Sequence, residues 1–151
     1  MSDMLIPDED HVARHVKGRE IEPDGTVSAA AFMLRGPKED KPAEQSLSVN
    51  WMEKTGVPDD TEQLKAILNI LRQKGRTVRK SSGFAVLNVG RSREDVRRQS
   101  IDQRKLSFVH EPDDGVDDTH AAIHGYSYLE NEIATLLAMS VNATTKVSQL
   151  D

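Results

Sequence analysis

The pattern of apolar and polar residues predicts one helix more clearly than any other element. Across residues 60–74, apolar side chains recur at i, i+3, i+4 and i+7, which places them on one face of a helix. Asp59 or Asp60 can cap its first turn, and Gly75 ends it. The apolar stripe consists of Leu64, Ile67, Leu68 and Leu71.

Several shorter segments have the alternation or the apolar content of β-strands. In residues 47–52, apolar residues alternate with Ser48 and Asn50, so these two polar side chains either face water or line a site. Residues 84–89 are almost all apolar, which indicates a central strand that is buried on both faces. The predicted strands are residues 11–16, 26–34, 47–52, 84–89 and 106–110.

Two further helices are predicted in the second half of the chain. A short basic helix follows Gly90, with Ser92 as its cap. The last helix begins after Ser127, which is expected to form a capping box with Glu130. The apolar stripe of this helix consists of Leu129, Ile133, Leu136, Leu137 and Val141.

The order of these elements predicts a single α+β domain over residues 1–151. Three strands come first, and helices then alternate with strands to the end. We expect a mixed, mostly antiparallel sheet with about three helices packed mainly on one face. The polar ends, near residues 1–9 and 143–151, are expected to be flexible.

The composition excludes several classes of protein. Hydrophobic residues make up 36% of the chain and charged residues 30%, as in a globular domain. The chain has neither the long apolar run of a membrane span nor the start of a signal peptide. It has no cysteine, which excludes disulfides and zinc–thiolate sites. We therefore expect a cytoplasmic protein that does not contact a membrane.

Charge is distributed unevenly along the chain. Residues 72–105 contain eleven basic and three acidic residues, a local charge of +8, although the whole chain carries −5. Such a segment either binds a phosphate-bearing ligand or an acidic partner, or forms a solvated face with its own salt bridges. The candidate residues for binding an anion or a partner are Arg91, Arg93, Arg97 and Arg98.

The segment from residue 106 to 125 contains three of the five histidines and an acidic loop. Imidazoles combined with a carboxylate suit a divalent transition metal such as zinc, manganese or iron. A bound metal would lower the pKa of its water and permit hydrolysis near neutral pH. The candidate metal ligands are His110, His120, His124 and Asp118, with Asp117 as the alternative carboxylate.

The same segment also suits catalysis without a metal. His110 and His120 would act as general base and acid, and Arg14 or Arg91 would hold a phosphoryl group. His11 is a further candidate for this site. In a helix, His11 and His15 would lie at i and i+4, a spacing that can chelate a metal. The valines and the short length favour a strand, in which the pair shares a face but does not form a chelate.

Four segments give the chain a resemblance to other proteins. They are DHVAR at residues 10–14, LSVNW at 47–51, FAVLNVG at 84–90 and HAAIHG at 120–125. In these the chain resembles a loose group of short bacterial proteins of unknown function. The resemblance implies no activity, cofactor or site residue.

Two hypotheses of function follow. In the first, the chain is a small interaction module that binds another protein through residues 72–105. In the second, it is a small hydrolase or phosphoesterase with its site around His110 and His120, so whether it is an enzyme stays open. Nucleic-acid binding is not favoured, because the chain has only six aromatic residues of the Phe, Trp and Tyr types and a negative net charge.

Overall fold

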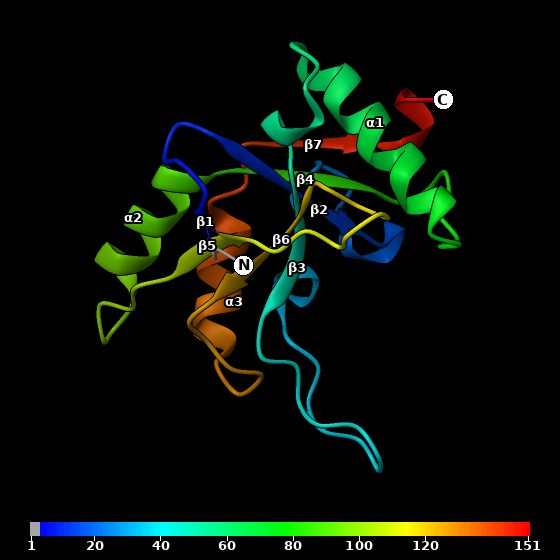
Figure 1. Cartoon of the computed structure of the whole chain (residues 1–151). Helices are drawn as coiled ribbons and strands as arrows, with labels where there is room; N and C mark the ends of the chain where they lie inside the picture. The colour runs from blue at the N-terminus through cyan, green and yellow to red at the C-terminus, as the bar shows by residue number, and fades with distance from the viewer. Residues whose placement is uncertain (1–3) are drawn as a thin grey trace.

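An antiparallel sheet forms the centre of the computed structural model, which describes residues 4–151 (Figure 1). Within these residues the sheet has seven strands in the order β1-β5-β6-β3-β2-β4-β7, and every neighbouring pair is antiparallel. The strands are β1 (Met4–Leu5), β2 (His11–Val16), β3 (Leu47–Trp51), β4 (Gly83–Asn88), β5 (Ser107–His110), β6 (His120–His124) and β7 (Ala143–Lys146).

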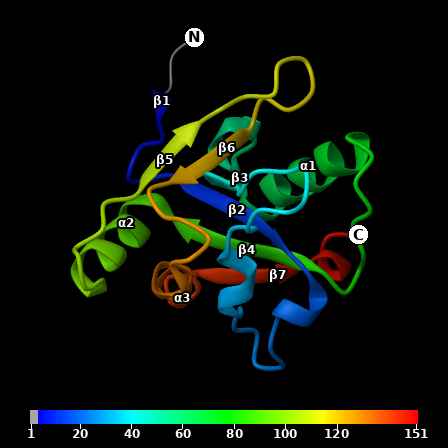
Figure 2. The ribbon, with the colours of Figure 1, turned by 90° about the horizontal axis from the view of Figure 1, so that it is seen from below.

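Helices cover both faces of this sheet. The α-helices are α1 (Asp60–Gln73), α2 (Val89–Gln99) and α3 (Asn131–Met139). Figure 2 shows α2 and α3 on one side of the sheet and α1 on the other. Short 3-10 helices are η1 (Gly18–Glu20), η2 (Ala29–Phe32), η3 (Glu53–Thr55) and η4 (Val147–Gln149). The predicted α+β domain is confirmed, with two of the three α-helices sharing a face.

Alternation along the strands divides the interior into two apolar clusters. In β2, Val12 and Val16 face α2 and α3, whereas Ala13 faces α1. In β4, Leu87 and Phe84 divide in the same way. A strand between two apolar layers needs apolar residues at every position, which explains the continuous run in β4.

The helix α1 forms as its periodicity predicts. The Asp59 carboxylate accepts a hydrogen bond from the Thr61 backbone N–H at 3.2 Å, which caps the first turn. The helix ends just before Gly75, which has a φ of +83°. Its stripe of leucines and isoleucine is buried against Phe84 and Val86 of β4.

Two predicted elements differ from the structure. Residues 26–34 do not form a strand, because the alanines favour a helical turn, and Ser28 Oγ accepts a hydrogen bond from the Ala30 N–H at 3.0 Å. The helix α2 begins at Val89, before the predicted cap Ser92, because the Asn88 side chain accepts from the Arg91 N–H at 2.8 Å.

The sheet also holds three strands that the pattern did not reveal. The β6 strand lies between β5 and β3. The segments expected to be flexible, near residues 1–9 and 143–151, contain β1 and β7, which pair with β5 and β4. Ile6, Val147 and Leu150 are buried beside these strands. Residues 1–3 of the first segment lie outside the described residues.

None of the helices within residues 4–151 is both long enough and apolar enough to cross a bilayer.

The start of α3 depends on an acidic side chain. The predicted capping box is half formed, since Glu130 accepts from the Ser127 N–H at 2.9 Å. Arg104 also donates to Glu130, with 2.8 Å between its Nη1 and Oε1. The hydrogen bonds from Arg104 outweigh partial burial and lower the pKa of Glu130 to about 2.

We predict that Glu130→Gln removes part of the acid sensitivity of the fold. Because the folded-state pKa lies below the ordinary value of 4.5, ionised Glu130 contributes stability above pH 4.5 that is lost as the pH falls toward 2. Urea unfolding across this range should show the wild type more stable than Glu130→Gln at higher pH and the two converging at low pH. Glu62→Gln, an exposed change on α1, should follow the wild type throughout. A constant gap between wild type and Glu130→Gln would contradict this account.

Candidate functional site

The candidate histidines of β5 and β6 point to opposite faces of the sheet. His110 lies opposite Ala121 in the strand register, and Ala121 belongs to the core beneath α2 and α3. His120 and His124 alternate with Ala121 and Ile123, so they face the other side. The structure therefore does not bring His110 and His120 together as an acid–base pair.

His110 has the surroundings of a structural residue. It is buried, its Nε2 donates to the Asp118 carbonyl at 2.7 Å, and its ring packs edge-on against Trp51 with 5.1 Å between centroids. The Asp118 carboxylate instead lies 3.9 Å from Lys54 Nζ and is largely exposed. The bond to the Asp118 carbonyl holds the loop after β5 against the sheet, and the contact with Trp51 packs His110 against β3.

Two other histidines each lie against a carboxylate. His11 Nδ1 is 2.7 Å from Glu53, and His124 Nε2 is 2.6 Å from Glu111. His11 lies two strands and two residues away from His120, a separation on the order of 10 Å. The predicted site of His11, His110 and His120 is therefore not assembled.

The candidate metal ligands are also separated. His110 faces away from His120 and His124, and the Asp118 carboxylate reaches none of them. Across residues 4–151, no group of three or more His, Cys, Asp or Glu side chains is placed to hold a metal ion.

Arg14, the candidate for a phosphoryl group, is held by the backbone. Its Nε donates to the Ala31 carbonyl at 3.0 Å and its Nη1 to the Ser48 carbonyl at 2.9 Å. Burial lowers its pKa. The backbone pairing of β2 with β3 ends after Ala13. The Arg14 side chain continues the connection between these two strands, which is a structural role.

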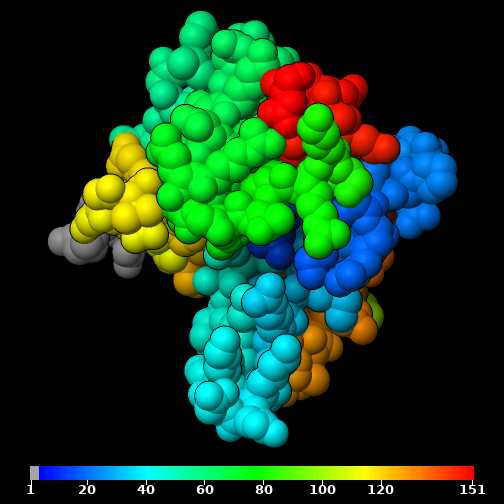
Figure 3. Space-filling view, turned by 90° about the vertical axis from the view of Figure 1, so that its right-hand side faces the viewer, coloured from blue at the N-terminus to red at the C-terminus, as the bar shows by residue number. Residues whose placement is uncertain are grey.

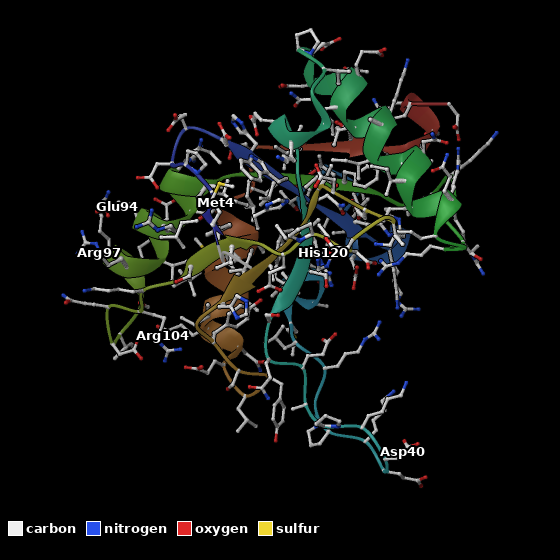
Figure 4. The ribbon with its side chains drawn as sticks, viewed as in Figure 1. Met4, Asp40, Glu94, Arg97, Arg104 and His120 are labelled. Atoms are coloured by element: carbon white, nitrogen blue, oxygen red, sulfur yellow. The ribbon has the colours of Figure 1, made fainter. Side chains whose placement is uncertain are left out.

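His120 lies beside a shallow pocket of about 400 Å³ near the middle of the sheet (Figure 4). Its Nδ1 donates to the Glu111 carbonyl at 2.8 Å, and its Nε2 is 3.4 Å from Ser48 Oγ. The pocket is lined by Lys74, Arg76, Glu111, Pro112, Asp113 and His120. Of the predicted catalytic residues, this pocket contains only His120.

A buried polar network that includes Lys74 lies beside this pocket. Asp117 is 1% exposed, and its Oδ2 accepts from Lys74 Nζ at 3.1 Å and from Asn50 Nδ2 at 3.0 Å. Its Oδ1 accepts from the Thr119 N–H and hydroxyl at 2.9 and 2.7 Å. Burial alone would raise the pKa of Asp117, but the bonds from Thr119 and Lys74 outweigh it and lower that pKa. Ionised Asp117 thus ties the loop of residues 111–118 to the end of α1.

Most candidate arginines on α2 are already paired with carboxylates. Arg91 lies 3.7 Å from Asp95, and Arg97 donates to Glu94 at 3.0 Å. Figure 4 shows Glu94 and Arg97 together on the outer side of α2, far from His120. Arg98 alone has no carboxylate within 4.0 Å in the part of the chain that the structure describes.

The N-terminus of α2, beside the candidates Arg91 and Arg93, is occupied by Asp8. The Gly90 N–H donates to the Asp8 carbonyl at 2.9 Å, and Arg93 pairs with the Asp8 carboxylate. A Cβ at residue 90 would lie only 2.8 Å from the Cβ of Asp8, so glycine permits this approach. The segment around Asp8 therefore already supplies a hydrogen-bond acceptor and a negative charge at the start of α2.

A group of unpaired cations, which includes Arg76 of the pocket beside His120, lies at the end of the sheet where β4 begins. The Gly18 backbone touches Ser81, and Gly83 pairs with Lys146, so three separate segments meet there. In Figure 3 the green loop after α1 lies between blue and red chain segments. The basic end, as we name this group, consists of Lys17, Arg19, Arg76, Arg79, Lys80 and Lys146, all exposed.

The basic end has few acidic neighbours. None of its six side chains has a carboxylate within 4.0 Å among residues 4–151. Two acidic residues lie next to it: Glu20, whose carboxylate accepts from the Lys17 N–H at 2.8 Å, and Asp151, which is paired with Arg72 at 2.9 Å. Arg76 also lines a pocket with Glu111 and Asp113. His15 lies close by, and burial, Arg14 and Arg76 together lower its pKa. The local potential is therefore positive.

Sequence reasoning did not predict that Lys74, Ser48 and Asn50 lie near His120 or Asp117. The polar face of residues 47–52 was the available signal for Ser48 and Asn50. No pattern pointed to Lys74, because its partner Asp117 is 43 residues away and becomes a neighbour only in the fold.

Comparisons of this chain with protein-family models, with curated proteins and with solved structures found no match.

We predict that Asp117→Asn destabilises the fold by about 3 kcal/mol, because it leaves the ammonium of Lys74 partly buried without its counter-charge. Urea unfolding monitored by the Trp51 fluorescence measures this loss. Asp113→Asn, a matched change at an exposed position of the same loop, should cost less than about 0.5 kcal/mol. Equal effects of the two changes would show that the ion pair contributes nothing specific.

Proposed function

We propose that this protein is an interaction module that binds an acidic segment of another protein through the basic end. The observation that carries the proposal is the absence of internal carboxylate partners for these six cations among residues 4–151. The proposal keeps the predicted role of the basic segment 72–105 for its loop of residues 74–82 and adds Lys17, Arg19 and Lys146, which lie outside that segment.

The contrast with α2 supports this choice of surface. An acidic partner that approached α2 would have to displace Asp95 from Arg91 and Glu94 from Arg97. At the basic end no such exchange is needed, since Arg76, Arg79 and Lys80 are solvated and unpaired among the described residues. Charges of one sign on a surface steer an oppositely charged partner and give binding that weakens with salt.

The chemistry of the partner follows from the kind of contact available. Guanidinium and ammonium groups bind carboxylates, so a run of Glu or Asp residues matches the spread of six cations. A phosphate-bearing ligand offers similar charge, but the basic end has no buried donor to fix one phosphate. Aromatic residues, on which nucleic-acid bases stack, are absent from the six positions.

The hydrolase hypothesis in its original form is not supported by the geometry. Its two central residues, His110 and His120, face opposite sides of the sheet.

We predict that reversing Arg76, Arg79 and Lys80 to Glu weakens binding of a fluorescein-labelled polyglutamate peptide by roughly tenfold or more, since three exposed ion pairs at ~0.5 kcal/mol each are lost. Fluorescence anisotropy at low and high salt measures the affinity, which should fall with salt for the wild type.

The matched control reverses Arg91, Arg97 and Arg98 on α2. Each reversal changes the charge by −2, so both triple variants go from −5 to −11 and differ only in position. The control should retain most of the affinity. Equal losses in the two variants would refute a localised site, and no binding by the wild type would refute the proposal.

A further inference from the structure

We propose that Ser48 and His120 form a nucleophile–base pair that cleaves esters whose acyl group carries an anion. The proposal shares Arg76 with the basic end, but its central residues, Ser48 and His120, lie outside that group. It rests on hydrogen-bond directions, on strand geometry and on the charges of the pocket beside His120.

The hydrogen bond at Nδ1 fixes the tautomer of His120. A backbone carbonyl only accepts, so Nδ1, at 2.8 Å from the Glu111 carbonyl, must carry the proton. In the neutral ring, Nε2 then has a free lone pair, and this atom is 3.4 Å from Ser48 Oγ. That distance is long for a hydrogen bond, as catalytic pairs often are before substrate binds. A carbonyl that orients one nitrogen while the other faces a hydroxyl is the arrangement of a general base.

Two rigid strands hold the pair. In the β3–β6 register, Asn50 lies opposite His120 and Ser48 opposite Ala122, so Ser48 is a diagonal neighbour of His120 on the same face. Ser48 is exposed, and Asn50 is fixed by its bonds to Asp117 and Thr119. The serine is therefore accessible while its base is held in place.

A second serine–histidine contact in the chain shows what an inactive pair looks like. Ser82 Oγ lies 2.9 Å from His15 Nε2, but its hydroxyl donates to the Arg79 carbonyl at 2.6 Å, and Ser82 is buried. Its proton is therefore unavailable to the histidine. Ser48 has no such acceptor for its hydroxyl among residues 4–151, so its proton can go to His120.

The pocket gives the substrate its class. Arg76 lines it with His120 and attracts a carboxylate or phosphate on the acyl part of an ester, whereas Lys74, which also lines it, is held by Asp117. Glu111 and Asp113 line the same pocket. The Glu111 carboxylate lies 2.6 Å from His124 Nε2.

The reaction proceeds in two balanced steps. Ser48 Oγ attacks the ester carbonyl carbon, and His120 Nε2 takes the hydroxyl proton. The bond to the leaving alcohol then breaks, and His120 gives the proton to the departing oxygen. In the second step water attacks the acyl-serine and loses its proton to His120, which returns it to Ser48 Oγ as the acid leaves.

The first test is covalent labelling of the intact protein by diisopropyl fluorophosphate, which forms a phosphoryl-serine and releases fluoride. Tandem mass spectrometry locates the adduct. We expect it on Ser48 and not on Ser107, an exposed serine of β5 on the same face, opposite His124. Because both serines lie in one folded molecule, this comparison needs no variant. No adduct on Ser48, or equal labelling of Ser48 and Ser107, overturns the proposal.

The second test asks whether His120 is the base. His120→Asn keeps an amide N–H that can donate to the Glu111 carbonyl but removes the base, so labelling of Ser48 should slow by about 100-fold or more. His11→Asn, on β2 beside Glu53 and outside the pocket, is the control and should leave the rate unchanged. Hydrolysis of mono-4-nitrophenyl succinate, an ester with a free carboxylate, should likewise be lost in Ser48→Ala and His120→Asn. Unchanged labelling in a folded His120→Asn, or hydrolysis that survives Ser48→Ala, overturns the assignment.

Discussion

The ion pair between Lys74 and Asp117 joins the two parts of the chain on which both proposals depend. Lys74 ends α1, and Asp117 lies in the loop between β5 and β6, where its side chain is fully buried. A buried carboxylate is tolerable only with a counter-charge and with its oxygens satisfied, and here Asn50 and Thr119 supply the remaining donors. The pair fixes the start of the loop that carries Arg76. It also fixes the part of the pocket beside His120 that Lys74 lines.

The alternation of strand side chains decides which residues can act together. Because successive positions face opposite sides of the sheet, His110 and His120 are separated although both lie near one hairpin. Ser48 and His120 meet although they are far apart in sequence. Position also decides which charges are paired. The arginines of α2 have acids at helical spacing on the same helix, whereas the loop of residues 74–82 contains no acid.

The sequence predicted the elements whose pattern is local. The stripe and the cap of α1 are both readable from spacing, and four strands show alternation or a continuous apolar run. The strand β6 was missed because small alanines between two histidines give neither pattern, and β7 because its residues Ala143–Lys146 are mostly polar and pair through the backbone at an edge. The pairing of Asn50 with Asp117 depends on placing β6 beside β3, which is a contact between distant segments. For the site, sequence reasoning therefore identified His120 and singled out Ser48 and Asn50 as possible site residues, but it did not predict that they lie next to His120.

The central claim is that the positive surface available to a partner is the basic end and not α2. NMR spectroscopy of the labelled protein during addition of a short polyglutamate peptide tests it most directly. The account predicts amide shift changes around residues 15–19, 75–82 and 145–147, together with a rise in the pKa of His15 as the peptide offsets the effect of Arg76. Shift changes confined to residues 91–98 of α2, with His15 unaffected, would contradict it.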